Sequence, residues 1–290
     1  MTKSLEHTEI ARDQSAVDAA VEREYRRHRM LRGRDLLLAI LTPVALLALW
    51  ELAAAFGAID ARLFTPPSEI VERGWDMIVG GELWVHVVAT VGRLAAGFVL
   101  GAVAGVLVGL VMGVSRPLRA AFGPTFTALY ALPKIAILPL LLLIFGLTET
   151  PKVLSVAISV FFVVQINTLA GIVQIDGRIL EAARAYQASG WKLFRYVLLP
   201  GATPSIMTGL RVSAGMAVIV VTAVEFVASN NGLGYLIWNS WQLFQPQTMF
   251  VGLITVSIIG AVVTGLIIVL ERALLPWQHS GGPRKKGKEQ

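Results

Sequence analysis

Two charged side chains and one amide lie within long apolar runs of this sequence, where they could contact a solute: Lys134, Glu225 and Asn167. An ionisable group is costly in lipid, so it usually faces a water-filled path or a partner of opposite charge. Pro133 and Pro139 flank Lys134, which predicts an irregular helix with free carbonyls nearby. A path lined by Lys134 would suit an anion. Two other interpretations stay open: Lys134 pairs with Glu225, or its ammonium reaches the membrane surface.

The residues that an enzyme would need are missing. No phosphate-binding segment of the form GxxxxGKS or GxxxxGKT occurs, and the chain has no cysteine. Its four histidines lie outside the apolar runs, at His7, His28, His86 and His279. A catalytic site at membrane depth would need several reactive groups to converge there. We therefore expect no catalytic residue, no metal site and no cofactor.

Composition indicates an integral membrane protein. Of the 290 residues, 55% are hydrophobic and 15% are charged, against about 25% charged in an ordinary soluble domain. A soluble fold of this size could not bury so much apolar surface in one core. The charges are also unevenly spread, since 15 of the 44 lie within residues 1–35. This pattern excludes a disordered chain, a nucleic-acid-binding protein and a disulfide scaffold.

Six apolar stretches are long enough to form helices that cross about 30 Å of hydrocarbon at about 1.5 Å per residue. They predict an all-α membrane protein with six transmembrane helices. We place these spans at about 36–56, 91–113, 122–145, 152–173, 205–228 and 248–270.

The basic residues predict that both termini are cytoplasmic. With that orientation the inside segments hold 19 of the 25 lysines and arginines, while the outside loops hold only Arg62, Arg73 and Lys152. The expected organisation is a charged cytoplasmic segment 1–35, a six-span domain 36–275 and a basic cytoplasmic tail 276–290. The arginines that end the first segment are read as determinants of topology.

Two of the outside loops have patterns of their own. In the loop 57–87, Pro66 and Pro67 end the preceding segment and Ser68 can cap a short helix at the membrane surface. The expected apolar stripe of that helix consists of Ile70, Val71, Trp75 and Ile78. The loop 229–247 is uncharged and rich in aromatic residues, which suits a re-entrant element and an aromatic belt equally well.

The cytoplasmic segment 174–204 predicts two short helices beneath the membrane. Asp176 can cap the first helix, and Ser189 with Gly190 would break it. Pro200 and Pro204 would stop the second helix before span five. The apolar positions expected to stripe the two helices are Ile179, Leu180, Ala183 and Tyr186 in the first, and Trp191, Phe194 and Leu198 in the second.

One motif in this segment resembles a known family. The run Glu181-Ala182-Ala183, followed at the matching distance by Leu199-Pro200, is similar to the EAA motif of membrane subunits of bacterial ATP-binding-cassette (ABC) importers. The family pattern has a glycine four residues after the second alanine, where this chain has Gln187. Gly190, three residues later, is the alternative position for the turn.

The resemblance covers about residues 36–275. The runs LFTPPSEIVERGW, LPKIAILPLLLLIFGLTETPKV and AVEFVASNNGLGYLIW are similar to the nitrate, sulfonate, taurine and bicarbonate permeases. It implies the type I ABC importer permease (MetI-like) fold in the bacterial cytoplasmic membrane. It also implies three kinds of partner: a second copy of the chain, two ABC ATPase subunits inside that hydrolyse ATP, and an extracytoplasmic substrate-binding protein outside.

By the same resemblance, the EAA segment would couple the ATPase to a path for a small anionic solute. The coupling residues are then Glu181, Ala182, Ala183, Gln187, Gly190, Leu199 and Pro200. A secondary transporter or channel without an ATPase is the alternative, and a membrane scaffold is a third class. The first alternative predicts repeated halves and ion-coupling acids, of which the sequence shows neither convincingly.

The second expected span contains a glycine repeat. Five glycines recur every fourth residue in the second span, at Gly97, Gly101, Gly105, Gly109 and Gly113. They form one ridge on a helix and predict close contact with another helix or subunit.

Overall fold

The computed structural model describes residues 34, 35 and 37–276, and within that part of the chain it contains helices and no strand. The described residues form two compact units that divide after Glu69. The first unit contains the helix Leu37–Ala55, which is long and apolar enough to cross a membrane. The predicted segment 1–35 and tail 276–290 lie almost wholly outside the described residues.

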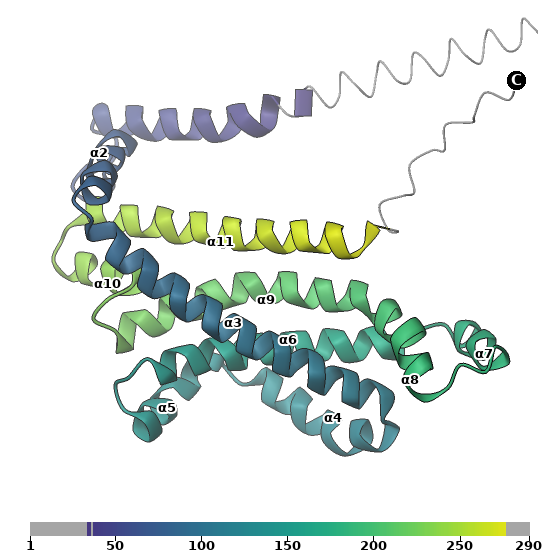
Figure 1. The fold of residues 1–290 in the computed structure, drawn as a ribbon. Helices are drawn as coiled ribbons and strands as arrows, with labels where there is room; N and C mark the ends of the chain where they lie inside the picture. The colour runs from purple at the N-terminus through teal and green to yellow at the C-terminus, as the bar shows by residue number, and fades with distance from the viewer. Residues whose placement is uncertain (1–33, 36, 277–290) are drawn as a thin grey trace, which may run out of the picture. The chain divides into compact units, whose positions relative to one another are not determined.

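The second unit is a helical bundle that α2 (Pro67–Val79) leads into (Figure 1). Four of its helical stretches are long and apolar enough to cross a membrane. A bent helix pair, Arg116–Ala131 with Lys134–Phe145, could form one further span. The all-α expectation is therefore confirmed, and the described helices give five spans, or the expected six when the bent pair counts as one span. The remaining elements follow in chain order: α3 (Glu82–Val114), α4 (Arg116–Ala131), η1 (Lys134–Ile137), α5 (Leu138–Phe145), α6 (Thr150–Val173), α7 (Gly177–Ala185), α8 (Gly190–Leu193), η2 (Phe194–Leu198), α9 (Leu199–Ala228), α10 (Leu233–Gln242) and α11 (Pro246–Leu274).

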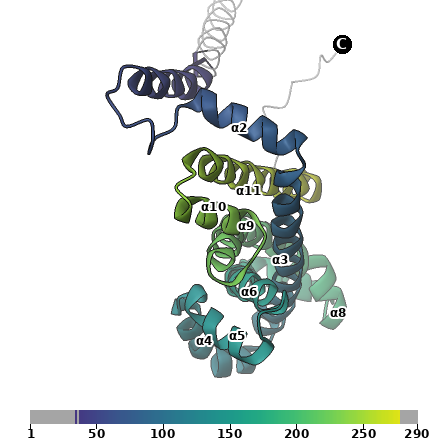
Figure 2. The same cartoon turned by 90° about the vertical axis from the view of Figure 1, so that its left-hand side faces the viewer.

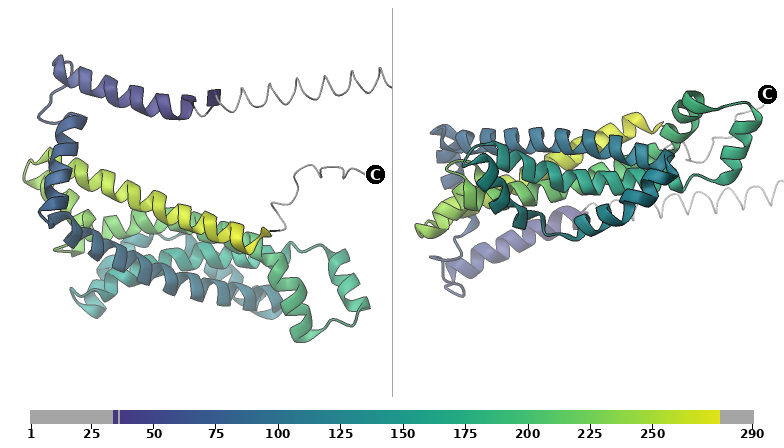
Figure 3. Two further views of the ribbon diagram at one scale, coloured as in Figure 1. Left: turned by 45° about the horizontal axis from the view of Figure 1, so that its top comes forward. Right: turned by 90° about the horizontal axis from the view of Figure 1, so that it is seen from below.

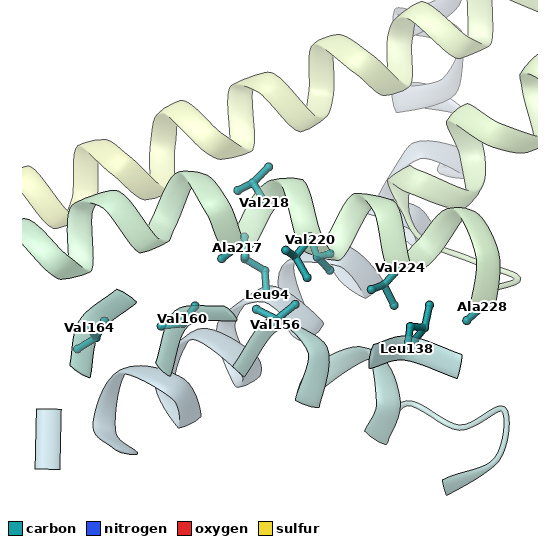
Figure 4. Close-up of a cluster of buried hydrophobic side chains, with 11 residues drawn as sticks. Leu94, Leu138, Val156, Val160, Val164, Ala217, Val218, Val220, Val224 and Ala228 are labelled. Atoms are coloured by element: carbon teal, nitrogen blue, oxygen red, sulfur yellow. The ribbon is translucent and has the colours of Figure 1, made fainter. Parts of the chain in front are cut away.

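Helix α6 packs against both α3 and α9 (Figures 1 and 2). One face of α6 carries Val156, Val160 and Val164, which are fully buried against valines and alanines of α9 (Figure 4). Leu94 of α3 and Leu138 of α5 complete the cluster. Because lipid offers no hydrophobic drive between helices, this contact is stabilised by close packing of small and branched side chains.

The glycine ridge of α3 packs onto these same valines of α6. A Cβ at Gly97 would lie 2.6 Å from Cβ of Val156, and one at Gly109 would lie 2.6 Å from Cβ of Thr168. A Cβ at Gly101 would overlap the carbonyl oxygen of Ala157. The ridge thus lets two helix backbones meet, and it is a contact between helices of one chain.

The third predicted span is broken. Helices α4 and η1–α5 are bent by 94° with respect to each other, at Leu132 and Pro133. Leu132 is extended, with φ −65° and ψ 137°, because a residue that precedes proline is pushed out of the helical region. The irregularity predicted around Lys134 is therefore present, but as a sharp corner.

One other local prediction is wrong. Pro200 and Pro204 do not stop a helix, since Gly190–Ala228 runs as one helical stretch. A π-helical turn, η2, precedes Pro200, and there the Leu199 N–H bonds to the Phe194 carbonyl, five residues back. This widened turn accommodates Pro200, which has no N–H to donate within the helix.

Helix α2 forms as predicted in the loop 57–87, and its apolar residues divide into two groups. Ile70 and Met77 are buried, whereas Val71, Trp75 and Ile78 are exposed. Contacts with α11 set the buried face, because Gly74 lies against Val251 and Arg73 Nε donates to Thr248 Oγ1 at 3.0 Å.

The α3–α6 contact gives a first prediction. Gly101→Ala should lower the thermal midpoint of the purified protein by an amount equivalent to about 1–3 kcal/mol, since backbone must shift to admit the methyl group. Gly92→Ala is the matched control on the same helix, where a Cβ meets nothing within 4 Å. Equal midpoints for the two variants would contradict the packing described here.

Candidate coupling and translocation sites

The EAA residues lie on α7, which stands apart from the bundle at the end where α3 and α6 finish (Figures 1 and 3). Asp176 caps α7 as predicted, since its carboxylate accepts from the Arg178 N–H at 2.9 Å. Hydrogen bonds from the side chain and backbone of Arg178 lower the pKa of Asp176. The predicted apolar face is not buried as one stripe. Leu180 and Ala183 are half-buried, whereas Ile179 and Tyr186 are exposed, as are Glu181 and Ala182.

The first helix of this pair ends earlier than the predicted break. Helix α7 finishes at Ala185, and Gln187 has φ +59°, the left-handed conformation that glycine favours. The Ala188 N–H bonds to the Ala183 carbonyl at 2.9 Å, and the Gln187 N–H bonds to the Arg184 carbonyl at 2.8 Å. These two bonds form a Schellman cap. Gln187 therefore occupies the turn position in which the family pattern has glycine.

The second helix of the pair is continuous with α9. Gly190 has φ +51° and opens α8, with Ser189 at its N-cap position. Trp191 stacks on Phe194 at 5.2 Å between ring centroids, and Leu198 is buried in the core beneath. Leu199 and Pro200 lie where η2 passes into α9. A displacement of α8 would therefore act directly on a helix of the bundle.

Lys134 lies at the corner between α4 and η1. Its ammonium donates to the Tyr130 carbonyl and lies 4.4 Å from the centroid of the Tyr130 ring. A lysine at the last turn of a helix is favourable because it bonds a carbonyl that has no intrahelical partner. The ammonium borders a cavity of about 410 Å³ whose other walls are apolar, including Met216 and Ile219 of α9.

Glu225 is bonded to Arg93 and not to Lys134. Arg93 Nη1 donates to Glu225 Oε1 at 2.7 Å, and the two side chains are 4% and 0% exposed. The Thr90 hydroxyl and the Gly234 N–H also donate to the Glu225 carboxylate, at 2.9 and 2.8 Å. Asn167, the third residue expected to line a path, bonds its own helix at the Val163 carbonyl, 2.8 Å away.

Two further charges complete a cluster around Arg93. Glu149 accepts from Arg93 Nε and Nη2 at 2.5 and 2.9 Å, and from Lys152 Nζ at 2.7 Å. These hydrogen bonds, that of Arg93 first, lower the pKa of Glu149 to about 2. The cluster joins α3, α6, α9 and the turn before α10. Sequence reasoning treated Lys152 as a loop residue and did not connect Arg93, Glu149 and Glu225, because their separations of 56 and 76 positions carry no periodic signal.

Residues 97–276 match the family model described as the binding-protein-dependent transport system inner membrane component. The chain belongs to this family. It is an ABC importer permease of the cytoplasmic membrane, as the EAA motif implied. Its relatives are transport permeases, in keeping with a subunit that has no catalytic role of its own.

Named relatives align over most of their length. SsuC of Bacillus subtilis (strain 168), whose name assigns it to aliphatic sulfonates transport, is 33% identical over 83% of this chain and 87% of its own. SsuC of Escherichia coli (strain K12) is 35% identical over 81% and 89%. The taurine transport system permease protein TauC of Escherichia coli (strain K12) is 29% identical over 84% and 91%.

The fold has a solved counterpart. A chain of the inward-facing MetNI methionine ABC transporter superposes with a TM-score of 0.57 at 18% identity, over 66% of this chain and 95% of that one. The MetI-like fold expectation is therefore confirmed. The roles of the seven coupling residues, and of Lys134, Glu225 and Asn167, stay predictions.

The Schellman cap can be tested directly. Gln187→Gly should stabilise the cap by about 1 kcal/mol, the cost of a side chain in the left-handed region. Hydrogen exchange followed by mass spectrometry should then show slower exchange in the peptide that contains Gln187 and Ala188. Faster exchange there, with unchanged exchange in α9, would refute the cap.

The buried ion pair gives a third prediction. Glu225→Gln should cost about 3–5 kcal/mol of stability, because it leaves a buried positive charge without its partner. Glu82→Gln is the control, since the Glu82–Arg73 pair is exposed and pairs of that kind contribute about 1 kcal/mol or less. Thermal unfolding of the two purified variants should separate them clearly, and similar midpoints would exclude a structural role for the Arg93–Glu225 pair.

Proposed function

We propose that this chain is the membrane-spanning subunit of an ATP-driven importer of small organic anions. In this assembly two copies form the path, two ABC ATPase subunits bind at the α7 end, and an extracytoplasmic binding protein delivers the solute at the Arg93 end. Both termini are then cytoplasmic, in agreement with the distribution of lysine and arginine. The observation that carries the proposal is α7 itself, a short helix outside the bundle that exposes apolar side chains.

The exposed side of α7 supports a docking role. Ile179 and Tyr186 are large and exposed, and Ala182 beside them is small enough to let another surface approach closely. An apolar surface beyond the membrane end of a bundle has no lipid to cover it, so a protein partner is its natural cover. The Schellman cap holds α7 at a fixed angle to α8, and α8 continues into α9.

Coupling then follows from differential binding. ATP closes the ATPase dimer, and the α7–α8 pair moves with it while α9 moves with α8. The ATPase can bias the path only to the extent that it binds one state of the permease more tightly than the other.

The lining of the Lys134 cavity supports an organic anion as the solute. One ammonium lies among apolar walls formed by Tyr130, Met216 and Ile219, and no carboxylate belongs to the described lining. A sulfonate or similar head would pair with the ammonium, and its carbon part would contact the walls. The names of the SsuC relatives agree with this chemistry. Helix α4 buries no side chain within the described chain, so a second copy beside it could close the path.

The docking role predicts the effect of a charge reversal. Glu181→Arg should remove the ATPase from the complex during co-purification, because it places a like charge or a clash in the contact. The thermal midpoint of the permease alone should not change, since Glu181 is exposed. Full retention of the ATPase, with ATP hydrolysis still stimulated by solute, would contradict the proposal.

The path role predicts the effect of removing the ammonium. Lys134→Met should lower the affinity for solute about tenfold or more, the equivalent of one charged hydrogen bond, while the assembled complex forms normally. Lys134→Arg keeps the charge and should retain most uptake. Uptake by Lys134→Met at the native rate would exclude Lys134 from the path.

A further inference from the structure

The hydrogen bonds of Arg93 use every donor of its guanidinium. Nε and Nη2 donate to the two oxygens of Glu149. Nη1 donates to Glu225 Oε1 and to the Asn231 carbonyl at 2.9 Å, and the second Nη2 hydrogen is directed to Asn231 Oδ1. Three of these five acceptors, Glu225 Oε1 and the two Asn231 oxygens, do not belong to Glu149 and orient the guanidinium plane without it.

The two acids of the cluster differ sharply in burial. Glu225 is completely buried and is held by α3 and by the backbone of the turn before α10. A Cβ at Gly232 would overlap its carboxylate, so the chain is packed directly onto it. The Glu149 side chain is 61% exposed, although Arg93 and Lys152 beneath it are each 4% exposed.

Glu149 also lies on an exposed turn. The turn Gly146–Glu149 joins α5 to α6, Gly146 has φ +70°, and both Leu147 and Thr148 are exposed. Rotation of the Glu149 side chain into solvent breaks no backbone bond of the cluster. The fixed part of the cluster can therefore persist without its fourth member.

The net charge of the cluster changes when the Glu149 side chain leaves it. With Glu149 in place, two cations and two anions balance. Without it, Arg93 and Lys152 face Glu225 alone, and a buried site with a net positive charge is left. Such a site is strongly unfavourable unless another anion enters it.

We infer that Arg93 and Lys152 form an anion-binding site at the α5–α6 turn, which the Glu149 carboxylate occupies in this structure and which the sulfonate or carboxylate head of a solute can occupy in its place. The guanidinium edge that holds Glu149 offers two parallel N–H groups, a geometry that matches a carboxylate or a sulfonate in two-point contact. The identity of the ligand as solute, but not the site itself, rests on the proposed function. The site would receive the solute head before it reaches Lys134.

A rescue experiment tests the site. The full-length chain carrying Glu149→Ala is purified in lipid nanodiscs, and its thermal midpoint is measured with increasing sodium methanesulfonate. We expect a midpoint below that of the native chain, which rises with the logarithm of methanesulfonate concentration as the vacated site fills. The native chain should respond little, because its own carboxylate competes for the site.

Two further variants serve as controls. Glu82→Ala removes an exposed acid whose partner, Arg73, is also partly exposed, so it should show no dependence on methanesulfonate. Glu149→Ala combined with Lys152→Met should lose the rescue, because one of the two cations is gone. If Glu149→Ala does not fold, Glu149→Gln purified with and without methanesulfonate replaces it, and the yield of monodisperse protein should be higher with the anion.

Equal responses of the Glu149 and Glu82 variants, or no response of either Glu149 variant, would overturn the inference. Neither result bears on the importer, because the experiment uses no ATPase, binding protein or uptake. Conversely, native uptake by Lys134→Met would count against the proposed path and leave the rescue intact.

Discussion

The close approach of α3 to α6 is the constraint on which the rest of this structure depends. Five glycines remove the side chains from one face of α3, and the backbones of the two helices meet along that face. The valines of α6 that meet these glycines also pack against α9. With α3 and α9 both packed on α6, the ends of all three helices are fixed relative to one another. The charged cluster around Arg93 and the α7–α8 pair lie at those ends.

The packing of α3, α6 and α9 also explains why a charged cluster is tolerated at one end of these helices. Arg93 on α3, Lys152 on α6 and Glu225 on α9 come from three helices, and each would be costly in lipid alone. Brought together with Glu149 they form a neutral group in which the described donors and acceptors bond one another. At the opposite end, α9 is continuous with α8 in the helical stretch Gly190–Ala228. The Schellman cap at the end of α7 precedes α8 in the chain. Helix α7 is therefore joined to α9 through only a capped turn and α8.

The sequence predicted what depends on composition, periodicity and short motifs. The six spans, the helix capped by Asp176, the irregular backbone at Lys134 and the glycine contact all follow from local patterns. The sequence did not predict the features that depend on local backbone adjustment or on contacts between distant residues. A π-helical turn accommodates Pro200 within one helical stretch, and Gln187 is left-handed in addition to Gly190. The Arg93 cluster unites residues distant in sequence, so no spacing rule could have shown that Glu225 would bond Arg93 and not Lys134.

The central claim is that α7 is the contact through which a separate ATPase moves this permease. Because the chain has no cysteine, a single Ala182→Cys substitution can carry a photoreactive benzophenone at that contact. In the assembled complex, irradiation should cross-link this position to the ATPase, and the ATPase should shield the thiol from a water-soluble maleimide. Leu147→Cys, exposed at the other end of the bundle, should react freely and form no such cross-link. An Ala182→Cys thiol that reacts as fast as the one at Leu147, with no cross-link to the ATPase, would contradict the account.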